Sequence, residues 1–362
     1  MSKTRIAVVL GTRPEIIKLS PVIRAAQRRD IPFTLIHTGQ HYSKDLDEVF
    51  FEDLNLPRPD HNLGVGSASQ GKQTGEMLVR IEEVLTADEP DVVLVQGDTN
   101  SVLAGAVAAA KLTPKIGHVE AGLRSYDRAM PEETNRVLTD HASDYLFAPT
   151  ADAADNLSKE GIDDERVFVT GNTVVDAVQQ NQTLAAEHSS VLARLNVEEG
   201  EFVLMTAHRA ENVDNNDRFI DIFASAEQVA AEFELPVIYP IHPRAKQRID
   251  EFEISVPDAV RLVDPLDFLD FLRLEDAARL VLTDSGGVQE ETCILGTPCV
   301  TMRDSTERPE TVEVGANTVV GTAPADVLEG AKLMVTRTDD WSNPFGDGSA
   351  ADRILDIVID ED

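Results

Sequence analysis

The chain is poor in cysteine, tryptophan and long apolar stretches. It has two cysteines, Cys293 and Cys299, and one tryptophan in 362 residues. The cysteines do not form a C-x-x-C pair, so we expect two small buried residues and neither a disulfide framework nor a redox pair. No apolar stretch approaches the roughly 18 residues that a membrane span needs. The N-terminus also lacks the apolar core of a signal peptide, so the sequence predicts a soluble, cytoplasmic protein.

Basic residues are scarce as well. Asp and Glu number 65 against 32 Lys and Arg, which gives a formal net charge of −33. This charge argues against nucleic acid as a partner, because its field repels phosphate backbones. Hydrophobic residues make up 42% of the chain in regular runs, which argues against disorder. We interpret the charge as an adaptation to high salt and not as that of an ordinary acidic protein. In molar salt the Debye length falls to about 3 Å, which screens the repulsion between the acidic side chains.

Short apolar runs alternate with helical patterns in both halves of the chain. This alternation predicts an α/β fold of two doubly wound, Rossmann-like domains facing a cleft, with ligands bound at the carboxyl ends of the strands. We place the domains at 1–172 and 173–350, and expect the last helix, 351–362, to pack back on the first domain. The strands are expected at 6–10, 33–37, 92–96, 116–120, 146–149, 202–206, 237–240, 260–263, 280–283 and 298–302, and helices at 16–29, 70–85 and 101–111.

A Gly-Gly turn follows the expected strand 280–283. Ser285, Gly286 and Gly287 are predicted to present bare backbone N–H groups at a helix N-terminus, where the helix dipole attracts phosphate. Glu290 and Glu291 are expected in the first turn of that helix, within reach of a ribose hydroxyl. The turn therefore predicts a nucleotide site in the second half of the chain.

Several motifs are missing. The turn after the first strand is not G-x-G-x-x-G, so no NAD site is expected, and no cofactor is predicted. The histidines lack the H-E-x-x-H spacing, so no metal site is predicted. No G-x-S-x-G elbow is present, which argues against an α/β-hydrolase.

Positive charge stands at the first strand–helix turn. Gly11 makes the turn, Pro14 suits a first helical position, and Arg13 and Lys18 flank it. Arg and Lys side chains bind phosphate oxygens strongly, and Arg does so in a bidentate manner. We interpret the pair as a clamp on a diphosphate; the alternative is a helix start with incidental surface charge.

Three carboxylates are candidates for acid–base chemistry. Asp98 follows the expected strand 92–96, with the alternative that it only caps the next helix. Glu120 ends another strand, and a carboxylate buried there needs a partner or a chemical role. Glu132 lies at the start of a helix and is followed by Glu133. Acidic side chains fit the helix dipole there, so a purely structural role suits Glu133. Asp98, Glu120 and Glu132 are expected to converge on one cleft.

The second half adds histidine and arginine. His208 and Arg209 follow the strand 202–206. His242 follows the next strand, 237–240, and is a weaker candidate for a site residue. Arg308 lies in the charged loop 302–310. We interpret it as a further positive charge that supports the sugar and phosphate contacts; the alternative is that the loop is simply solvated. We expect His208 to contact the diphosphate or to assist proton transfer.

Taken together, these segments resemble the non-hydrolysing UDP-N-acetylglucosamine 2-epimerases. The resemblance implies the glycosyltransferase-B type of fold, usually a homodimer, and interconversion of UDP-GlcNAc and UDP-ManNAc without NAD. The matching stretches, in order through most of the chain, are GTRPEIIKLSPV (11–22), QGDT (96–99), GHVEAGLRS (117–125), PEETNR (131–136), TGNTVVDA (170–177), AHRAEN (207–212), LTDSGGVQEE (282–291) and MRDSTERPE (302–310).

Site residues follow from the resemblance by motif. Bacterial members also bind a regulatory UDP-GlcNAc, and Gln40, Arg209 and His242 fit that site, whereas residues 42–44 depart from the usual sequence. The resemblance implies the catalytic residues Asp98, Glu120, Glu132 and His208, and the UDP contacts Arg13, Lys18, Arg136, Ser285, Gly286, Gly287, Glu291 and Arg308.

The C2 proton of the sugar is not next to a carbonyl, so a base alone does not remove it. We expect the anomeric C–O bond to break first, after which a carboxylate takes the acidified C2 proton and leaves UDP and 2-acetamidoglucal. Four alternatives stay open: a glycosyltransferase, an epimerase of a UDP-2,3-diacetamido uronic sugar, a hydrolysing epimerase and a non-enzymatic UDP-sugar-binding protein.

Overall fold

The structure is a computed structural model that describes residues 4–40, 50–337 and 341–360. The chain forms two compact units. Unit 1 comprises Met1–Ala177 and Phe345–Asp362, and unit 2 comprises Val178–Pro344. The sequence-based division at residues 172 and 350 lies close to these bounds. Each unit has its own parallel sheet and its own hydrophobic core.

Unit 1 contains a seven-stranded sheet in the order β3-β2-β1-β4-β5-β6-β7. All strand pairs are parallel, and the central strands β1 and β4 are buried along their whole length, as expected for a sheet with helices on both faces. The strand order reverses between β1 and β4. The strands are β1 (Ile6–Leu10), β2 (Phe33–His37), β3 (His61–Asn62), β4 (Val92–Gln96), β5 (Lys115–Val119), β6 (Tyr145–Ala148) and β7 (Val167–Val169).

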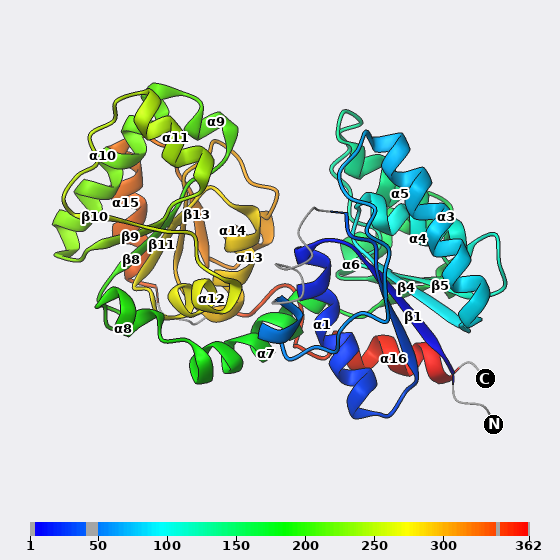
Figure 1. Cartoon of the computed structure of the whole chain (residues 1–362). Helices are drawn as coiled ribbons and strands as arrows, with labels where there is room; N and C mark the ends of the chain where they lie inside the picture. Colours follow the sequence, from blue (N-terminus) through cyan, green and yellow to red (C-terminus); the bar gives the residue numbers. More distant parts are fainter. Residues whose placement is uncertain (1–3, 41–49, 338–340, 361–362) are drawn as a thin grey trace. The chain divides into compact units, whose positions relative to one another are not determined.

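Helices connect these strands, and the last helix of the chain belongs to the same unit (Figure 1). α16 packs on α1 through buried Ile354 and Leu355. Arg28 pairs with Asp352 at 2.9 Å, and this exposed pair lies at the edge of the contact. The helices of unit 1 are α1 (Arg13–Arg28), α3 (Gln70–Asp88), α4 (Asn100–Ala109), α5 (Pro131–Ala142), α6 (Ala151–Lys159), the 3₁₀ turn η1 (Asp164–Arg166), α7 (Thr173–His188), which runs on into unit 2, and α16 (Ala350–Asp360).

Unit 2 repeats the same topology with six strands. Its order is β10-β9-β8-β11-β12-β13, again parallel throughout, and the order reverses between β8 and β11. The strands are β8 (Val203–Thr206), β9 (Val237–Pro240), β10 (Val260–Val263), β11 (Leu280–Thr283), β12 (Cys299–Thr301) and β13 (Asn317–Val319). The helices are α8 (Val191–Leu195), α9 (Ala210–Val213), α10 (Asn216–Phe233), α11 (Pro243–Glu251), α12 (Phe268–Ala277), α13 (Gly286–Leu295), α14 (Pro309–Glu313) and α15 (Pro324–Val335).

The predicted fold class is confirmed. All ten expected strands are present, with bounds that agree within a residue or two. Three strands were not predicted, namely β3, β7 and β13, and each has only two or three residues. A run of this length is too short to show a period of two, so the pattern of the sequence does not reveal it.

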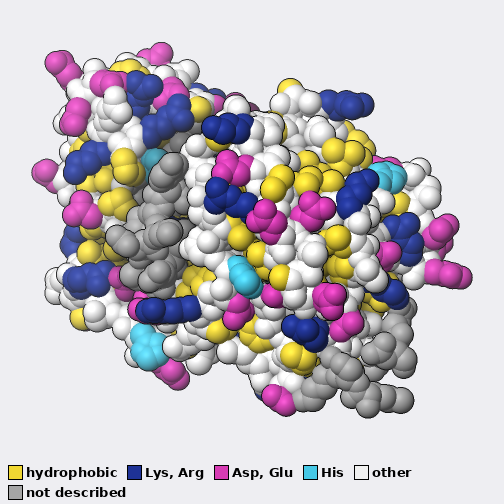
Figure 2. All heavy atoms as spheres, turned by 45° about the vertical axis from the view of Figure 1, so that its right-hand side comes forward, with side chains coloured by type: hydrophobic (Ala, Val, Ile, Leu, Met, Phe, Trp, Pro, Cys, Tyr) yellow, Lys and Arg dark blue, Asp and Glu magenta, His cyan; other side chains and the backbone are white. Residues whose placement is uncertain are grey.

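The acidic excess is spread over the surface. On the face shown in Figure 2, Asp and Glu side chains alternate with Lys, Arg and apolar side chains and form no single acidic block. Within the described part of the chain, no helix combines the length and the apolar character that crossing a membrane requires.

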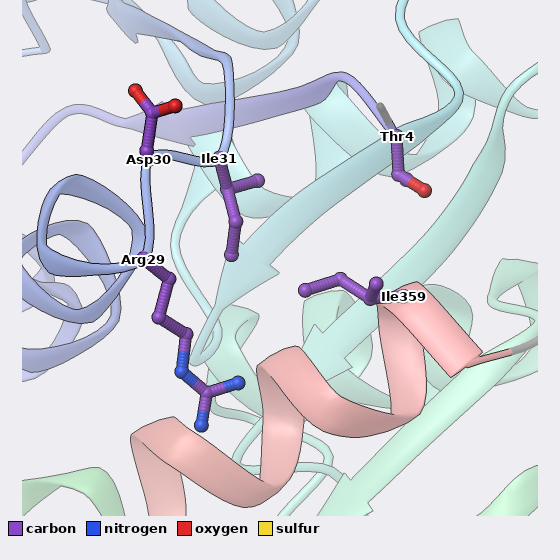
Figure 3. Close-up of a pocket in the computed structure, with 5 residues that line it drawn as sticks. All are labelled: Thr4, Arg29, Asp30, Ile31 and Ile359. Carbon is purple, nitrogen blue, oxygen red and sulfur yellow. The ribbon is translucent and has the colours of Figure 1, made fainter. Parts of the chain in front are cut away.

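A shallow pocket lies at the amino end of β1, between the C-terminal end of α1 and α16 (Figure 3). Ligands of doubly wound sheets bind at the opposite edge, beyond the carboxyl ends of the strands. This pocket is therefore not a candidate for the predicted site. Its lining residues are Thr4, Arg29, Asp30, Ile31 and Ile359.

Candidate active site

The predicted site residues gather at the two places where the strand order reverses. In a doubly wound sheet the loops on either side of this reversal diverge and leave room for a ligand. In unit 1 these loops follow β1 and β4 and carry Arg13 and Asp98. In unit 2 they follow β8 and β11 and carry His208 and the turn 285–287.

The turn after β1 has no room for a side chain at its glycine. A Cβ atom on Gly11 would lie 2.0 Å from Thr38 Oγ1 and 2.2 Å from Ser101 Oγ. Close packing therefore requires this glycine. Arg13 begins α1 and is exposed, and its guanidinium lies 5.8 Å from the centre of the Phe50 ring.

Glu120 occupies a strained position at the end of β5. Its φ angle of 70° lies in the left-handed region, which a residue with a Cβ seldom adopts and which is frequent at functional sites. Its side chain is only 7% exposed and forms an ion pair of 2.6 Å with Lys18 Nζ. Gln96 also donates to it from the end of β4. Lys18, predicted to contact the nucleotide, thus neutralises a predicted catalytic carboxylate.

Asp98 does not cap the following helix. Thr99 is the N-cap of α4, so the alternative interpretation of Asp98 is wrong. Its carboxylate pairs instead with Arg136, which also contacts Glu133 at 3.2 Å. Arg136 is therefore held by two carboxylates in this structure.

The two neighbouring acids at the start of α5 differ in their surroundings. Glu133 is 6% exposed and accepts from Ser125 N and Ser125 Oγ at 2.9 Å and from Tyr126 N at 3.0 Å. Burial alone would raise the pKa of Glu133, but these hydrogen bonds and the charge of Arg136 outweigh it and lower the pKa. Glu133 has the predicted structural role. Glu132 is exposed, one helical turn before Arg136.

A buried charge network supports the loops that carry Asp98 and Glu120. His118 lies on β5, is fully buried, and contacts Asp140 through Nδ1 at 2.6 Å and the Gly97 carbonyl through Nε2 at 2.8 Å. Both partners are acceptors, so both contacts are hydrogen bonds only when both ring nitrogens carry a proton. Arg124 pairs with the other oxygen of Asp140 at 2.7 Å. Burial opposes ionisation of Asp140, but the charges and hydrogen bonds of His118 and Arg124 lower its pKa.

The Gly-Gly turn of unit 2 is a helix N-terminus, as predicted. α13 begins at Gly286, and no described residue accepts a hydrogen bond from the N–H of Gly286 or Gly287. Neither glycine has a positive φ, and a Cβ on either would meet nothing closer than 3.9 Å. The protein itself therefore does not require glycine at these two positions. The prediction for Ser285 is wrong in one respect, because its N–H donates to Thr283 Oγ1 at 2.9 Å and is not bare.

The two acids of α13 lie one turn later than predicted. The first turn of α13 contains no acidic residue, so Glu290 and Glu291 belong to its second turn. Glu290 is 5% exposed and pairs with Arg308 at 2.6 Å. Arg308 thus braces the loop against α13. The same loop is not merely solvated, because Arg303 is 6% exposed and forms a two-pronged ion pair with Glu307.

His208 is positioned by a buried aspartate. Asp284 is fully buried and accepts from the N–H of His208 at 3.1 Å and of Arg209 at 3.0 Å. Its Oδ1 also lies 3.3 Å from His208 Nδ1. Burial, Arg209 and His242 lower the pKa of His208, and the charge of Asp284 offsets part of that shift. The imidazole is therefore neutral at neutral pH, with 42% of its side chain exposed.

The three residues predicted for a regulatory site lie in both units. Gln40, in unit 1, accepts from Ser101 Oγ at 2.6 Å, next to the turn that carries Asp98. In unit 2, His242 caps α11 by accepting from Arg244 N at 3.2 Å, and its ring centre lies 6.3 Å from that of His208. Arg209 lies 4.0 Å from Glu307. Residues 42–44, which depart from the family pattern, lie outside the described residues.

Among the described residues there is neither a cluster of metal ligands nor an exposed thiol. Within the described ranges, no three His, Cys, Asp or Glu side chains are grouped so that they could hold a metal ion. Both cysteines are free and buried, which confirms the prediction, and burial raises the pKa of each thiol to about 12. Neither thiol is a nucleophile at neutral pH.

Three residues at the site were not singled out from the sequence. Glu15 was visible in principle, because Thr12 and Glu15 have the T-x-x-E spacing of a capping box, and Glu15 Oε2 accepts from Thr12 N at 3.2 Å. Gln96 ends a strand, but no motif or spacing in the sequence marks it as a site residue. Asp284 directly precedes the Gly-Gly turn, and its burial became visible only in the structure.

The fold and these residues define a nucleotide-binding α/β protein with two Rossmann-like units of the glycosyltransferase-B type. A model of the family described as UDP-N-acetylglucosamine 2-epimerase matches residues 24–359. A UDP-N-acetylglucosamine 2-epimerase of Methanocaldococcus jannaschii is 51% identical over 360 residues, which cover 98% of each chain. The chain belongs to the UDP-N-acetylglucosamine 2-epimerase family.

Two further relatives bear on the substrate. A crystal structure of the UDP-GlcNAc 2-epimerase from M. jannaschii in complex with UDP-GlcNAc and UDP is 51% identical, has a TM-score of 0.84, and matches over 98% of this chain and 99% of that chain. A UDP-2,3-diacetamido-2,3-dideoxy-D-glucuronate 2-epimerase of Pseudomonas aeruginosa is 41% identical and covers 98% of this chain and 99% of its own length.

Proposed function

We propose that this protein is an isomerase that interconverts UDP-GlcNAc and UDP-ManNAc. The observation that carries the proposal is the start of α13, where Gly286 and Gly287 have no described acceptor for their N–H groups and no conformational or packing need for glycine. Glycine at such a place lets a ligand approach the backbone closely, and a helix N-terminus favours phosphate. Family membership, through relatives about half identical to this chain, supports UDP-GlcNAc as the substrate.

In this proposal, unit 2 binds the UDP portion. The N–H groups of Gly286 and Gly287 and the Ser285 side chain contact the diphosphate, with Arg13 of unit 1 as a further cation. Glu291 contacts the ribose. Donors of this kind stabilise the charge that develops on departing UDP, and each is worth roughly 3–4 kcal/mol in comparable sites. His208, neutral and partly exposed, contacts the diphosphate or relays a proton.

The carboxylates of unit 1 act on the sugar. Cleavage of the anomeric C–O bond releases UDP with the bonding electron pair and leaves an oxocarbenium-like centre. A carboxylate then removes the C2 proton, and 2-acetamidoglucal forms. Inversion requires a proton from the opposite face, followed by attack of UDP on the anomeric carbon. The candidates are Asp98, which pairs with Arg136, Glu120, which pairs with Lys18, and Glu132.

The test is to incubate the purified protein with UDP-GlcNAc in D₂O and to follow the products by NMR. We expect UDP-ManNAc with deuterium at C2, together with small amounts of UDP and 2-acetamidoglucal. Product without deuterium at C2 would exclude the proton-transfer scheme. Glu120→Gln should abolish conversion, whereas Asp352→Asn, which changes an exposed ion pair of α16, should leave it unchanged.

Two alternatives have specific support. The relative from P. aeruginosa favours a UDP-2,3-diacetamido uronic sugar as the substrate, and conversion of that sugar in preference to UDP-GlcNAc would establish it. A glycosyltransferase would use the same type of fold, but it needs one base at most and should require an acceptor for turnover. Absence of UDP-ManNAc together with sugar transfer to an added acceptor would favour this alternative.

Five finer properties also belong to the proposal. The net charge of −33 supports function at high salt, and full activity and folding at low ionic strength would contradict this adaptation. A homodimer is proposed from the family, to be checked by light scattering. Gln40, Arg209 and His242 are proposed to bind a regulatory UDP-GlcNAc, which sigmoidal kinetics would reveal. The cytoplasmic location and a role in polysaccharide synthesis stay predictions.

A further inference from the structure

We propose that Glu15 is a positioning residue: while ionised it holds the turn that carries Arg13 and the turn that carries Asp98 in one arrangement, and it holds them less tightly when protonated. The inference rests on the proposed function, which assigns a role to both turns. Glu15 itself was not among the predicted site residues, and it is almost fully buried.

The geometry places Glu15 across the reversal of the strand order in unit 1. Its carboxylate is 2% exposed, and Oε2 accepts from Gly11 N at 2.5 Å and from Thr12 N at 3.2 Å, both in the turn after β1. Oε1 accepts from the hydroxyl of Thr99, in the turn after β4. Thr99 in turn caps α4 by accepting from Val102 N at 3.5 Å. One side chain therefore joins the residue before Arg13 to the residue after Asp98.

This arrangement depends on the charge of Glu15. An ionised carboxylate only accepts hydrogen bonds, whereas a protonated carboxyl must donate one. Both oxygens of Glu15 face donors. A proton on Oε2 would face the N–H groups of Gly11 and Thr12, whereas a proton on Oε1 requires the Thr99 hydroxyl to turn and accept. In both cases the carboxyl loses its charge, and charge-assisted hydrogen bonds are roughly twice as strong as neutral ones, so its hold on both turns weakens.

The titration of Glu15 falls in the working range of a neutral enzyme. Burial raises its pKa from 4.5 to about 7, although the hydrogen bonds from Thr99, Gly11 and Thr12 act in the opposite direction. Glu15 is mostly protonated at pH 6 and mostly ionised at pH 8. The charged or titratable side chains on the surrounding elements are Arg13 and Lys18 on α1, His37 on β2, Asp98 after β4 and Glu120 after β5, which Lys18 neutralises.

The experiment compares kcat and KM of the wild type, Glu15→Gln and a matched control between pH 5.5 and 9. Asp176→Asn is the control, because Asp176 is also buried in unit 1 with a pKa raised by burial, yet it binds Ala351 N at 3.0 Å at the start of α16. In the wild type we expect kcat/KM at pH 6 to be about tenfold below its plateau, one pKa unit below a midpoint near 7. Asp176→Asn should keep this acid limb.

Glutamine resembles the protonated acid, so Glu15→Gln is fixed in the low-pH arrangement. Its kcat should be about 10- to 100-fold low at pH 8, the range expected for misplaced catalytic groups, and the acid limb should be absent. A purely structural role would lower activity at every pH and leave the limb in place. Persistence of the limb in Glu15→Gln would overturn the inference.

NMR separates this inference from the proposed function. If the wild type converts no UDP sugar, the proposed function fails, but the amide signals of Gly11, Thr12 and Thr99 should still titrate together with a midpoint near pH 7. Amide shifts that stay flat across this range in the wild type would overturn the role of Glu15, even if the variant does not fold.

Discussion

Replacing Asp140 with asparagine should destabilise unit 1 more than any change to its surface ion pairs. Asp140 is fully buried and accepts from His118 Nδ1 at 2.6 Å and pairs with Arg124 at 2.7 Å. Gly122 N also donates to it at 3.3 Å. Asparagine keeps one acceptor oxygen but turns an NH₂ group toward a donor, and it removes the buried negative charge, so that Arg124 keeps only its ion pair with Glu160.

Removing one partner of a buried ion pair costs about 3–5 kcal/mol, a large part of the roughly 5–15 kcal/mol that stabilises a typical protein. For a unit of 150–250 residues, about 2–4 °C of melting temperature is lost per kcal/mol. Asp140→Asn should therefore lower the melting temperature of unit 1 by roughly 6–20 °C.

The measurement is thermal and urea unfolding of the wild type, Asp140→Asn and Asp352→Asn in molar KCl. Asp352 pairs with Arg28 at the surface, where such pairs are worth about 0–1 kcal/mol. Salt screens that exposed pair but not the buried network. If Asp140→Asn lost no more stability than Asp352→Asn, the buried network would not support these loops as argued.

Three further predictions follow from single contacts. Glu15→Gln should flatten the pH dependence of the free energy of unfolding. Burial raises the pKa of Glu15 in the folded state from 4.5 to about 7, so the wild type should lose about 3 kcal/mol of stability as pH rises through this window. Equal pH slopes of the wild type and the variant in urea unfolding would contradict this. Gly287→Ala should keep stability or raise it by up to about 1 kcal/mol, because the added Cβ would meet no protein atom closer than 3.9 Å. The same Cβ should obstruct the approach of a phosphate and weaken UDP binding at least about tenfold, as measured by calorimetry. Unchanged affinity would mean that no phosphate approaches there. Asp284→Asn should move the NMR titration of His208 to lower pH, because the charge that raises its pKa is removed; an upward or absent shift would contradict that assignment.

The fold was predictable because its signals are local. The ten expected strands are short apolar runs, and most of them are buried between helices, so their sequence pattern is recognisable without knowledge of their partners. The edge strand β10 is the exception, because it is largely exposed. The carboxyl-terminal placement of Arg13, Asp98, His208 and Gly286 follows from the same pattern, since parallel strands end at one edge of the sheet. The strand order was accessible only through the expected fold class.

Two polar contacts at the site were not visible in the sequence pattern. Lys18 was interpreted as a cation for phosphate, and the structure adds an ion pair with Glu120, which lies 102 residues away in the sequence. Ser285 was expected to offer a bare N–H, and the acceptor that satisfies it is the Thr283 hydroxyl of the preceding strand. Sequence periodicity reports which face of an element is buried, but not which polar groups meet on that face.

In both units a buried carboxylate joins the two loops at the reversal of the strand order. In unit 1, Glu15 accepts two N–H groups of its own turn and reaches the turn after β4. In unit 2, Asp284 belongs to the turn after β11 and accepts from the turn after β8. In each unit, a buried acid therefore spans the reversal of strand order, where the two loops would otherwise diverge. The acids differ in their donors: Asp284 accepts only N–H groups, whereas Glu15 depends on the Thr99 hydroxyl as well. Burial raises the pKa of Glu15 to about 7, so the pH response that we propose belongs to unit 1, which carries the proposed acid–base groups.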